Sequence, residues 1–197
     1  MKTCHHGLIM PPPYFPNSRW PAFTYQGTVY DLAHLDEYEF TMVDTEGLTR
    51  RIAVTFADHC FTRPPVPGDD PALAYPGSDR RPGHFCFVRH QLSLGLTGHI
   101  ERISGGQVWS VEGDNFAALP VVDQAGRLVL YGIMFSLDRV SSLPVQLHMR
   151  VRTAYPIDDK IPATYGVVRF RHLVALRMKG KKPPRIVGAH RKRPKLP

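Results

Sequence analysis

Two apolar stretches separated by a short polar segment, LVLYGIMFSL at 128–137 and LPVQLHMRVRTAY at 143–155, constrain the fold most strongly. In the second stretch alternate residues are predicted to face opposite sides. The buried set is Leu143, Val145, Leu147, Met149, Val151 and Thr153, and the polar face carries Gln146, His148, Arg150, Arg152 and Ala154. A period of two is typical of a β-strand with one buried face. With the intervening turn at 138–142, the two stretches predict a long antiparallel hairpin at the middle of a sheet.

The order of the other elements predicts the fold class. We expect a strand with a turn over 23–32, a hairpin of 38–43 and 51–56 around a turn at 44–47, and short strands at 107–111 and 115–122. A helix is predicted over 92–103, because four apolar residues recur there at helical spacing, and a last strand over 166–176. The connections are too short for repeated crossover helices. The chain is therefore predicted to be a single α+β domain with a mainly antiparallel sheet and one or two short helices.

The segments outside this core differ from it in proline content and in charge. Residues 1–22 are predicted to form a Pro-rich arm whose aromatic residues lie on the body, and residues 64–82 a Pro/Gly-rich surface loop within the domain at 23–176. Nine of the 25 Lys and Arg residues lie in 177–197, which has no acidic residue, so this segment carries the whole net charge of +8. We expect a basic disordered tail there that either keeps the protein soluble or binds polyphosphate.

Location can also be inferred from composition. No apolar run approaches the roughly 20 residues that cross a bilayer, and the first residues lack the apolar core of a secretory signal. Three cysteines, an odd number, favour a reducing compartment. The expectation is a cytoplasmic protein without a membrane partner.

The polar face of the second long strand is the first candidate site. His148, Arg150 and Arg152 follow one another on that face, and Thr153 and Tyr155 lie beyond them. Cleavage of RNA through its 2′-hydroxyl needs a base, an acid and donors for the negative charge on phosphorus, which these residue types supply without a metal or other cofactor. The alternative interpretation is an exposed sheet face whose charges keep the protein soluble.

Histidines and cysteines elsewhere offer further candidates. His90 and His99 lie in or beside the predicted helix, where they can act as general acid or base or simply face solvent. Two Cys and two His can form a tetrahedral zinc site, but adjacent strand residues point to opposite faces. The cysteines are alternatively buried apolar residues or a redox or catalytic thiol. The residues of this cluster are His59, Cys60, His84 and Cys86.

Part of the chain resembles a known family. The resemblance covers about 30–176 and is carried by Arg81, Phe85-Cys86, Arg89, Leu92-Ser93, Leu96, Ile100, Asn115-Phe116, 131–135, 151–155 and 168–170. It is to a bacterial family of plasmids and prophages, some members of which are labelled "stationary phase growth adaptation protein"; this resemblance implies no activity. A weaker resemblance is to metal-independent toxin ribonucleases of the barnase–colicin–RelE superfamily. It implies an active site of Arg152, Thr153 and Tyr155 with His90 or His99, although two or three strands precede the helix here.

The sequence thus predicts a metal-independent endoribonuclease or toxin-like RNA-acting protein of a mobile element. The alternatives are a non-catalytic accessory module that binds nucleic acid or protein, and a small zinc-binding module. The expected partner is nucleic acid, with RNA favoured, and a protein such as an antitoxin is a further expectation. Basic residues of the last strand and tail are predicted to contact nucleic acid: Arg169, Arg171, Lys179, Lys181, Lys182, Arg185, Arg191, Lys192 and Arg193.

Overall fold

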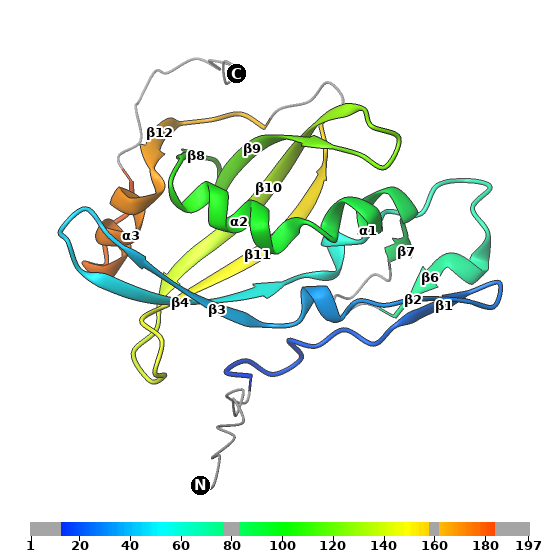
Figure 1. Cartoon of the computed structure of the whole chain (residues 1–197), viewed down its shortest axis with the longest axis horizontal. Helices are drawn as coiled ribbons and strands as arrows, with labels where there is room; N and C mark the ends of the chain where they lie inside the picture. Colours follow the sequence, from blue (N-terminus) through cyan, green and yellow to red (C-terminus); the bar gives the residue numbers. More distant parts are fainter. Residues whose placement is uncertain (1–12, 77–82, 158–161, 184–197) are drawn as a thin grey trace, which may run out of the picture.

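A computed structural model describes residues 13–76, 83–157 and 162–183, and it confirms the α+β class. Its centre is a seven-stranded sheet with the strand order β12-β8-β9-β10-β11-β4-β3 (Figure 1). All pairs in this sheet are antiparallel except β11 and β4, which run parallel. The strands are β3 (Tyr38–Val43), β4 (Thr49–Phe56), β8 (Gln107–Ser110), β9 (Asn115–Val122), β10 (Leu128–Arg139), β11 (Leu147–Pro156) and β12 (Gly166–Arg169).

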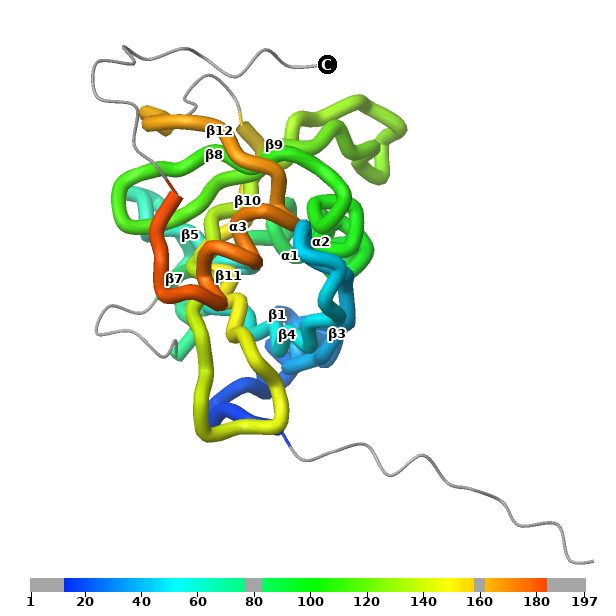
Figure 2. Tube along the Cα trace, turned by 90° about the vertical axis from the view of Figure 1, so that its left-hand side faces the viewer, coloured from blue at the N-terminus to red at the C-terminus, as the bar shows by residue number. Residues whose placement is uncertain are grey.

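The predicted central hairpin is formed by β10 and β11, with a longer connection than expected. β10 continues to Arg139, and β11 begins only at Leu147. Pro144, which has no N–H for a ladder, lies in the loop between them, and the N–H of Val140 donates to the carbonyl of Gln146 to close it. This loop projects from the body of the molecule in both views (Figures 1 and 2).

The alternation along β11 holds as far as Val151 and is then shifted by one residue. Met134 pairs with Thr153, whereas its neighbour Phe135 pairs with Val151, so Arg152 is the extra residue of a β-bulge. The next buried residue is accordingly Ala154, which was predicted to share the polar face. The bulge therefore moves Thr153 from the predicted buried set to the side opposite Ala154.

Helices cover the buried face of the sheet. The predicted helix over 92–103 is two helices, α1 (Phe87–Ser93) and α2 (Leu96–Ser104), which are separated at Gly95. Leu96 and Ile100 are fully buried, as their spacing predicts. The predicted strand over 166–176 is wrong beyond residue 169, because Phe170–Met178 forms helix α3. No helix within the described ranges is long and apolar enough to cross a membrane.

Smaller elements surround this core. β1 (Phe23–Tyr25) and β2 (Thr28–Tyr30) form a separate hairpin, and β5 (Thr62–Arg63), β7 (Gly83–Phe85) and β6 (Ala74–Tyr75) form a three-stranded sheet. β6 and the short helix η3 (Pro71–Leu73) lie within the predicted loop at 64–82. Two more single-turn helices are η1 (Ala33–Leu35) and η2 (Asp58–Cys60). Residues 13–22, the described part of the predicted arm, form neither helix nor strand and run along the sheet beneath β4 (Figure 1).

Candidate functional site

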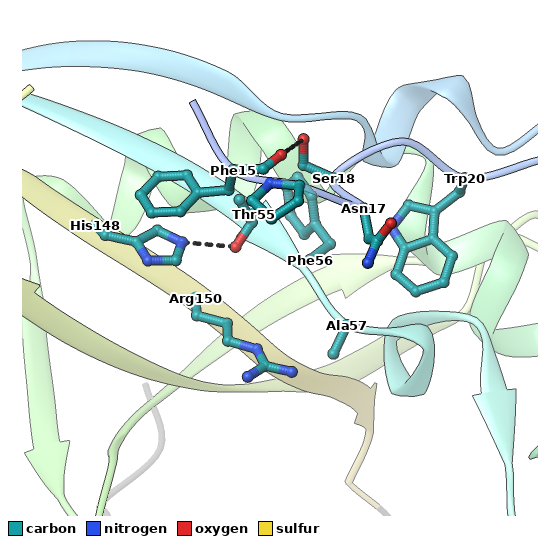
Figure 3. Close-up of a pocket in the computed structure, with 10 residues that line it drawn as sticks. Phe15, Asn17, Ser18, Trp20, Thr55, Phe56, Ala57, His148 and Arg150 are labelled. Carbon is teal, nitrogen blue, oxygen red and sulfur yellow. Dashed lines mark hydrogen bonds between the residues drawn. The ribbon is translucent and has the colours of Figure 1, made fainter. Parts of the chain in front are cut away.

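A pocket of about 320 Å³ lies between the N-terminal arm and the outer face of strands β4 and β11. The arm covers one side, and side chains of the two parallel strands form the other (Figure 3). His148 and Arg150, two of the predicted site residues, line it together. The other lining residues are Phe15, Pro16, Asn17, Ser18, Trp20, Thr55, Phe56 and Ala57.

His148 is held in place from two sides. Its ring stacks on the ring of Phe15 with the centroids 3.7 Å apart and 16° between the planes. Its Nε2 is hydrogen-bonded to Oγ1 of Thr55 across the β4–β11 pair, at 2.7 Å. Burial lowers the pKa of the imidazole; the charges of Glu37 and Asp138 oppose this shift and that of Arg150 adds to it. The ring is therefore mainly neutral at neutral pH.

Two carboxylates just before β3 anchor the arm over the pocket. The two oxygens of the Glu37 carboxylate accept hydrogen bonds from the backbone N–H groups of Tyr14, at 2.8 Å, and Phe15, at 3.0 Å. Asp36 accepts another from the N–H of Trp20, at 3.1 Å. The Trp20 ring then packs edge-on against Phe61 of the core. The arm is thus fixed at both ends of the pocket.

Arg150 is the cation of the pocket without a counter-ion. Within the part of the chain that the structure describes, no hydrogen bond or ion pair engages its guanidinium. Two other arginines of β4 and β11 have counter-ions: Arg51 binds the Glu39 carboxylate with two nitrogens, and Arg152 lies 3.2 Å from a carboxylate oxygen of Asp114. Figure 3 shows the Arg150 side chain extended along the pocket floor toward Ala57.

The remaining residues of the predicted strand site are directed elsewhere. The guanidinium of Arg152 forms an ion pair with Asp114, in the β8–β9 turn. The Thr153 hydroxyl donates to the carbonyl of His59, at 3.3 Å. The Tyr155 ring lies under the guanidinium of Arg89, 5.6 Å from its centroid. The five residues predicted as one catalytic group are therefore split, and two of them reach the pocket.

The two predicted helical histidines do not join them. His90, on α1, is hydrogen-bonded to the carbonyl of Asp31 at 3.0 Å. His99, on α2, packs edge-on against Tyr131, which belongs to the buried face of β10. Since His148 lies on the outer face of the sheet, His99 is on the other side of it. Burial lowers the pKa of His99.

Two of the four residues considered as zinc ligands, Cys60 and His84, have other partners. Cys60 is fully buried, its Sγ lies 3.8 Å from the carbonyl oxygen of Val151, and burial raises its pKa to about 12. His84 pairs through Nδ1 with Asp69, at 3.0 Å. Among the described residues no three His, Cys, Asp or Glu side chains come together as a metal site. The interpretation of the cysteines as buried apolar residues agrees with the position of Cys60 in the core.

The predicted basic surface is also divided. β12 pairs with β8 at the edge of the sheet, so three strands separate it from β11, and Arg169 and Arg171 do not extend the surface of His148. Arg177 and Met178 belong to α3 rather than to a tail, and Lys179 pairs with Glu46. Lys181 and Lys182 are exposed. The other predicted contacts, Arg185, Arg191, Lys192 and Arg193, lie outside the described residues.

Sequence reasoning missed the other half of the pocket. The aromatic residues of the arm indicated that it lies on the body, but nothing in the sequence indicated where. Thr55 was predicted within a strand, and its role depends on the parallel β4–β11 pairing, in which it stands opposite Arg150. No local signal marks a pairing between residues so far apart in the chain.

Comparison with known proteins assigns the chain to a family. No curated protein and no solved structure matches it. The model of the YjaZ family matches residues 22–178, which include the seven-stranded sheet and helices α1, α2 and α3 but not the part of the arm that covers the pocket. On the strength of this match over most of its length, the chain belongs to the YjaZ family.

Proposed function

We propose that this protein is a non-catalytic RNA-binding module that uses the pocket between the arm and strands β4 and β11. The observation that supports this most is the unpaired guanidinium of Arg150 in a pocket flanked by the aromatic rings of Phe15 and Trp20. A guanidinium suits a phosphate group, and aromatic rings suit bases. The net charge of +8 favours a polyanionic partner as well.

Binding fits the arrangement better than cleavage. Cleavage through the 2′-hydroxyl needs a base, an acid and charge-stabilising donors around one phosphate. Here His99, the Thr153 hydroxyl and the Tyr155 ring all make contacts away from the pocket. Nε2 of His148 is occupied by Thr55, and one ring face is covered by Phe15. One histidine and one arginine can hold a phosphate without cleaving it.

Binding to a mixed single-stranded oligoribonucleotide, measured by fluorescence anisotropy at several salt concentrations, tests this proposal. Affinity should fall as salt rises, because neutralised phosphates release counterions. Arg150→Gln should weaken binding about tenfold, the usual effect of losing a charged hydrogen bond. Arg127→Gln is the matched control, since it removes the same charge at the exposed β9–β10 turn. Absence of measurable binding by the full-length protein would refute the proposal.

Incubating the same protein preparation with RNA tests the prediction that the protein is a nuclease. RNA recovered after incubation in excess EDTA should be intact on a denaturing gel. EDTA-resistant cleavage that disappears in both His148→Gln and Arg150→Gln would replace the proposed function by a metal-independent endoribonuclease. Cleavage unaffected by either substitution would point to a contaminating enzyme and leave the binding measurement as the deciding one.

A further inference from the structure

The pocket has the properties of a subsite for one end of an RNA chain. Resting on the RNA-binding function above, we propose that it receives a terminal phosphate, with Arg150 as the principal ligand. None of the residues that line the pocket is acidic. Since the neighbouring Arg51 and Arg152 each face a carboxylate, Arg150 is where an added anion meets uncompensated positive charge.

One residue that lines the pocket also has an unpartnered hydrogen-bond donor. The indole N–H of Trp20 is buried and has no hydrogen-bond partner among the described residues. A buried donor of this kind costs free energy unless an acceptor reaches it. Asn17 adds a side-chain amide and adopts a left-handed backbone with φ of 57°. Figure 3 shows Asn17 between the Trp20 ring and the other lining side chains. An incoming group rich in acceptor oxygens would complement this set.

The size of the pocket and the aromatic side chains at its two ends favour the end of a chain over its interior. A volume of about 320 Å³ is near the lower limit for small-ligand sites. The stacked rings of Phe15 and His148 lie at one end and the ring of Trp20 at the other (Figure 3). An internal phosphate enters with a nucleotide on each side, whereas a terminal phosphate enters alone. A terminal phosphate also carries a second negative charge near neutral pH, which strengthens its pairing with a guanidinium.

Three forms of one short oligoribonucleotide test the proposal: 5′-phosphorylated, 3′-phosphorylated and hydroxyl-ended. At least one phosphorylated form should bind the wild-type protein about tenfold more tightly than the hydroxyl form. Arg150→Gln should abolish this preference while leaving weaker binding of the hydroxyl form. Arg127→Gln should keep the preference. Equal affinity for all three forms would overturn the subsite and leave RNA binding standing; no binding of any form would refute both proposals.

The indole N–H gives an independent readout. The chain has two tryptophans, Trp20 and Trp109, so their indole signals in a ¹H–¹⁵N spectrum are assigned by one substitution, Trp20→Phe. Adding the phosphorylated oligonucleotide should shift the Trp20 signal and leave that of Trp109, on β8, in place. Competition by inorganic phosphate tests whether the site binds free phosphate or the phosphate at an RNA end. If it displaces the labelled RNA as effectively as the unlabelled phosphorylated oligonucleotide, the site is one for free phosphate, and the RNA-end proposal is wrong.

Discussion

The rings of Phe15 and His148 stack 3.7 Å apart although 132 residues of chain separate them, so the arm determines the environment of the pocket histidine. Phe15→Ala should remove this cover and raise the pKa of His148 toward its ordinary value, because burial is the main cause of its lowering. Stability should fall by about 1 kcal/mol. Phe15→Leu, which keeps an apolar cover, should shift the pKa less. NMR titration of the imidazole measures both; an unchanged pKa in Phe15→Ala would contradict this account.

Stability should decline as the solution is acidified from pH 7.5 to pH 5.5. Burial lowers the pKa values of His34, His99 and His148 in the folded protein, so between the folded and unfolded values the unfolded chain binds more protons. Acidification through about pH 6.5, the unfolded value, therefore favours unfolding. Urea denaturation at the two pH values measures the decrease in the free energy of unfolding. This decrease should be smaller in His148→Gln. The control is His172→Gln, at an exposed position on α3, for which the full loss should remain.

The arm should open when its anchor is removed. Glu37→Ala deletes the carboxylate that accepts from two backbone N–H groups of the arm. Each such bond to a charged group contributes about 1 kcal/mol when partly exposed. Trypsin cleaves after Arg19, which is exposed within the arm, so cleavage there should become faster. Glu112→Ala, at an exposed position of the β8–β9 turn, is the control. Equal cleavage rates in both variants would show that Glu37 does not hold the arm.

Two glycines should respond to alanine with opposite signs. A Cβ at Gly83 would lie 2.6 Å from Oγ1 and 2.8 Å from Cβ of the buried Thr62, so Gly83→Ala should destabilise by about 1–3 kcal/mol. A Cβ at Gly98, on the exposed side of α2, meets nothing within 4 Å. Gly98→Ala should stabilise by about 0.5–1 kcal/mol, because alanine favours the helix. Thermal unfolding of both variants checks the pair, and destabilisation by Gly98→Ala would contradict it.

The sequence was sufficient for features that depend on neighbouring residues. Alternation placed His148 and Arg150 on the outer face of one strand, and helical spacing placed Leu96 and Ile100 in the core. The sequence-based prediction was wrong where a helical period and a strand period occur next to each other. Phe170, Leu173 and Val174 have helical spacing, but the valines just before them extended the strand pattern, so α3 was predicted as strand.

Other features depended on partners far away in the chain. The bulge at Arg152 is defined by the register of β11 against β10, and a shift of one residue leaves the strand composition unchanged. The stacking of Phe15 on His148 likewise requires knowing how the arm crosses the sheet. Half of the candidate site was therefore beyond single-sequence reasoning, although both of its β11 residues were predicted.

The parallel pairing of β4 with β11 also has a consequence during synthesis of the protein. Ile52 pairs with Leu147, about 95 residues later in the chain. At about 5–20 residues per second, the ribosome needs roughly 5–20 seconds to make that stretch. During this time the β3–β4 hairpin presents an unpaired strand edge that the finished molecule covers. The nascent chain is thus exposed to mispairing or chaperone capture after the β3–β4 hairpin emerges, and synthesis of β11 ends that interval.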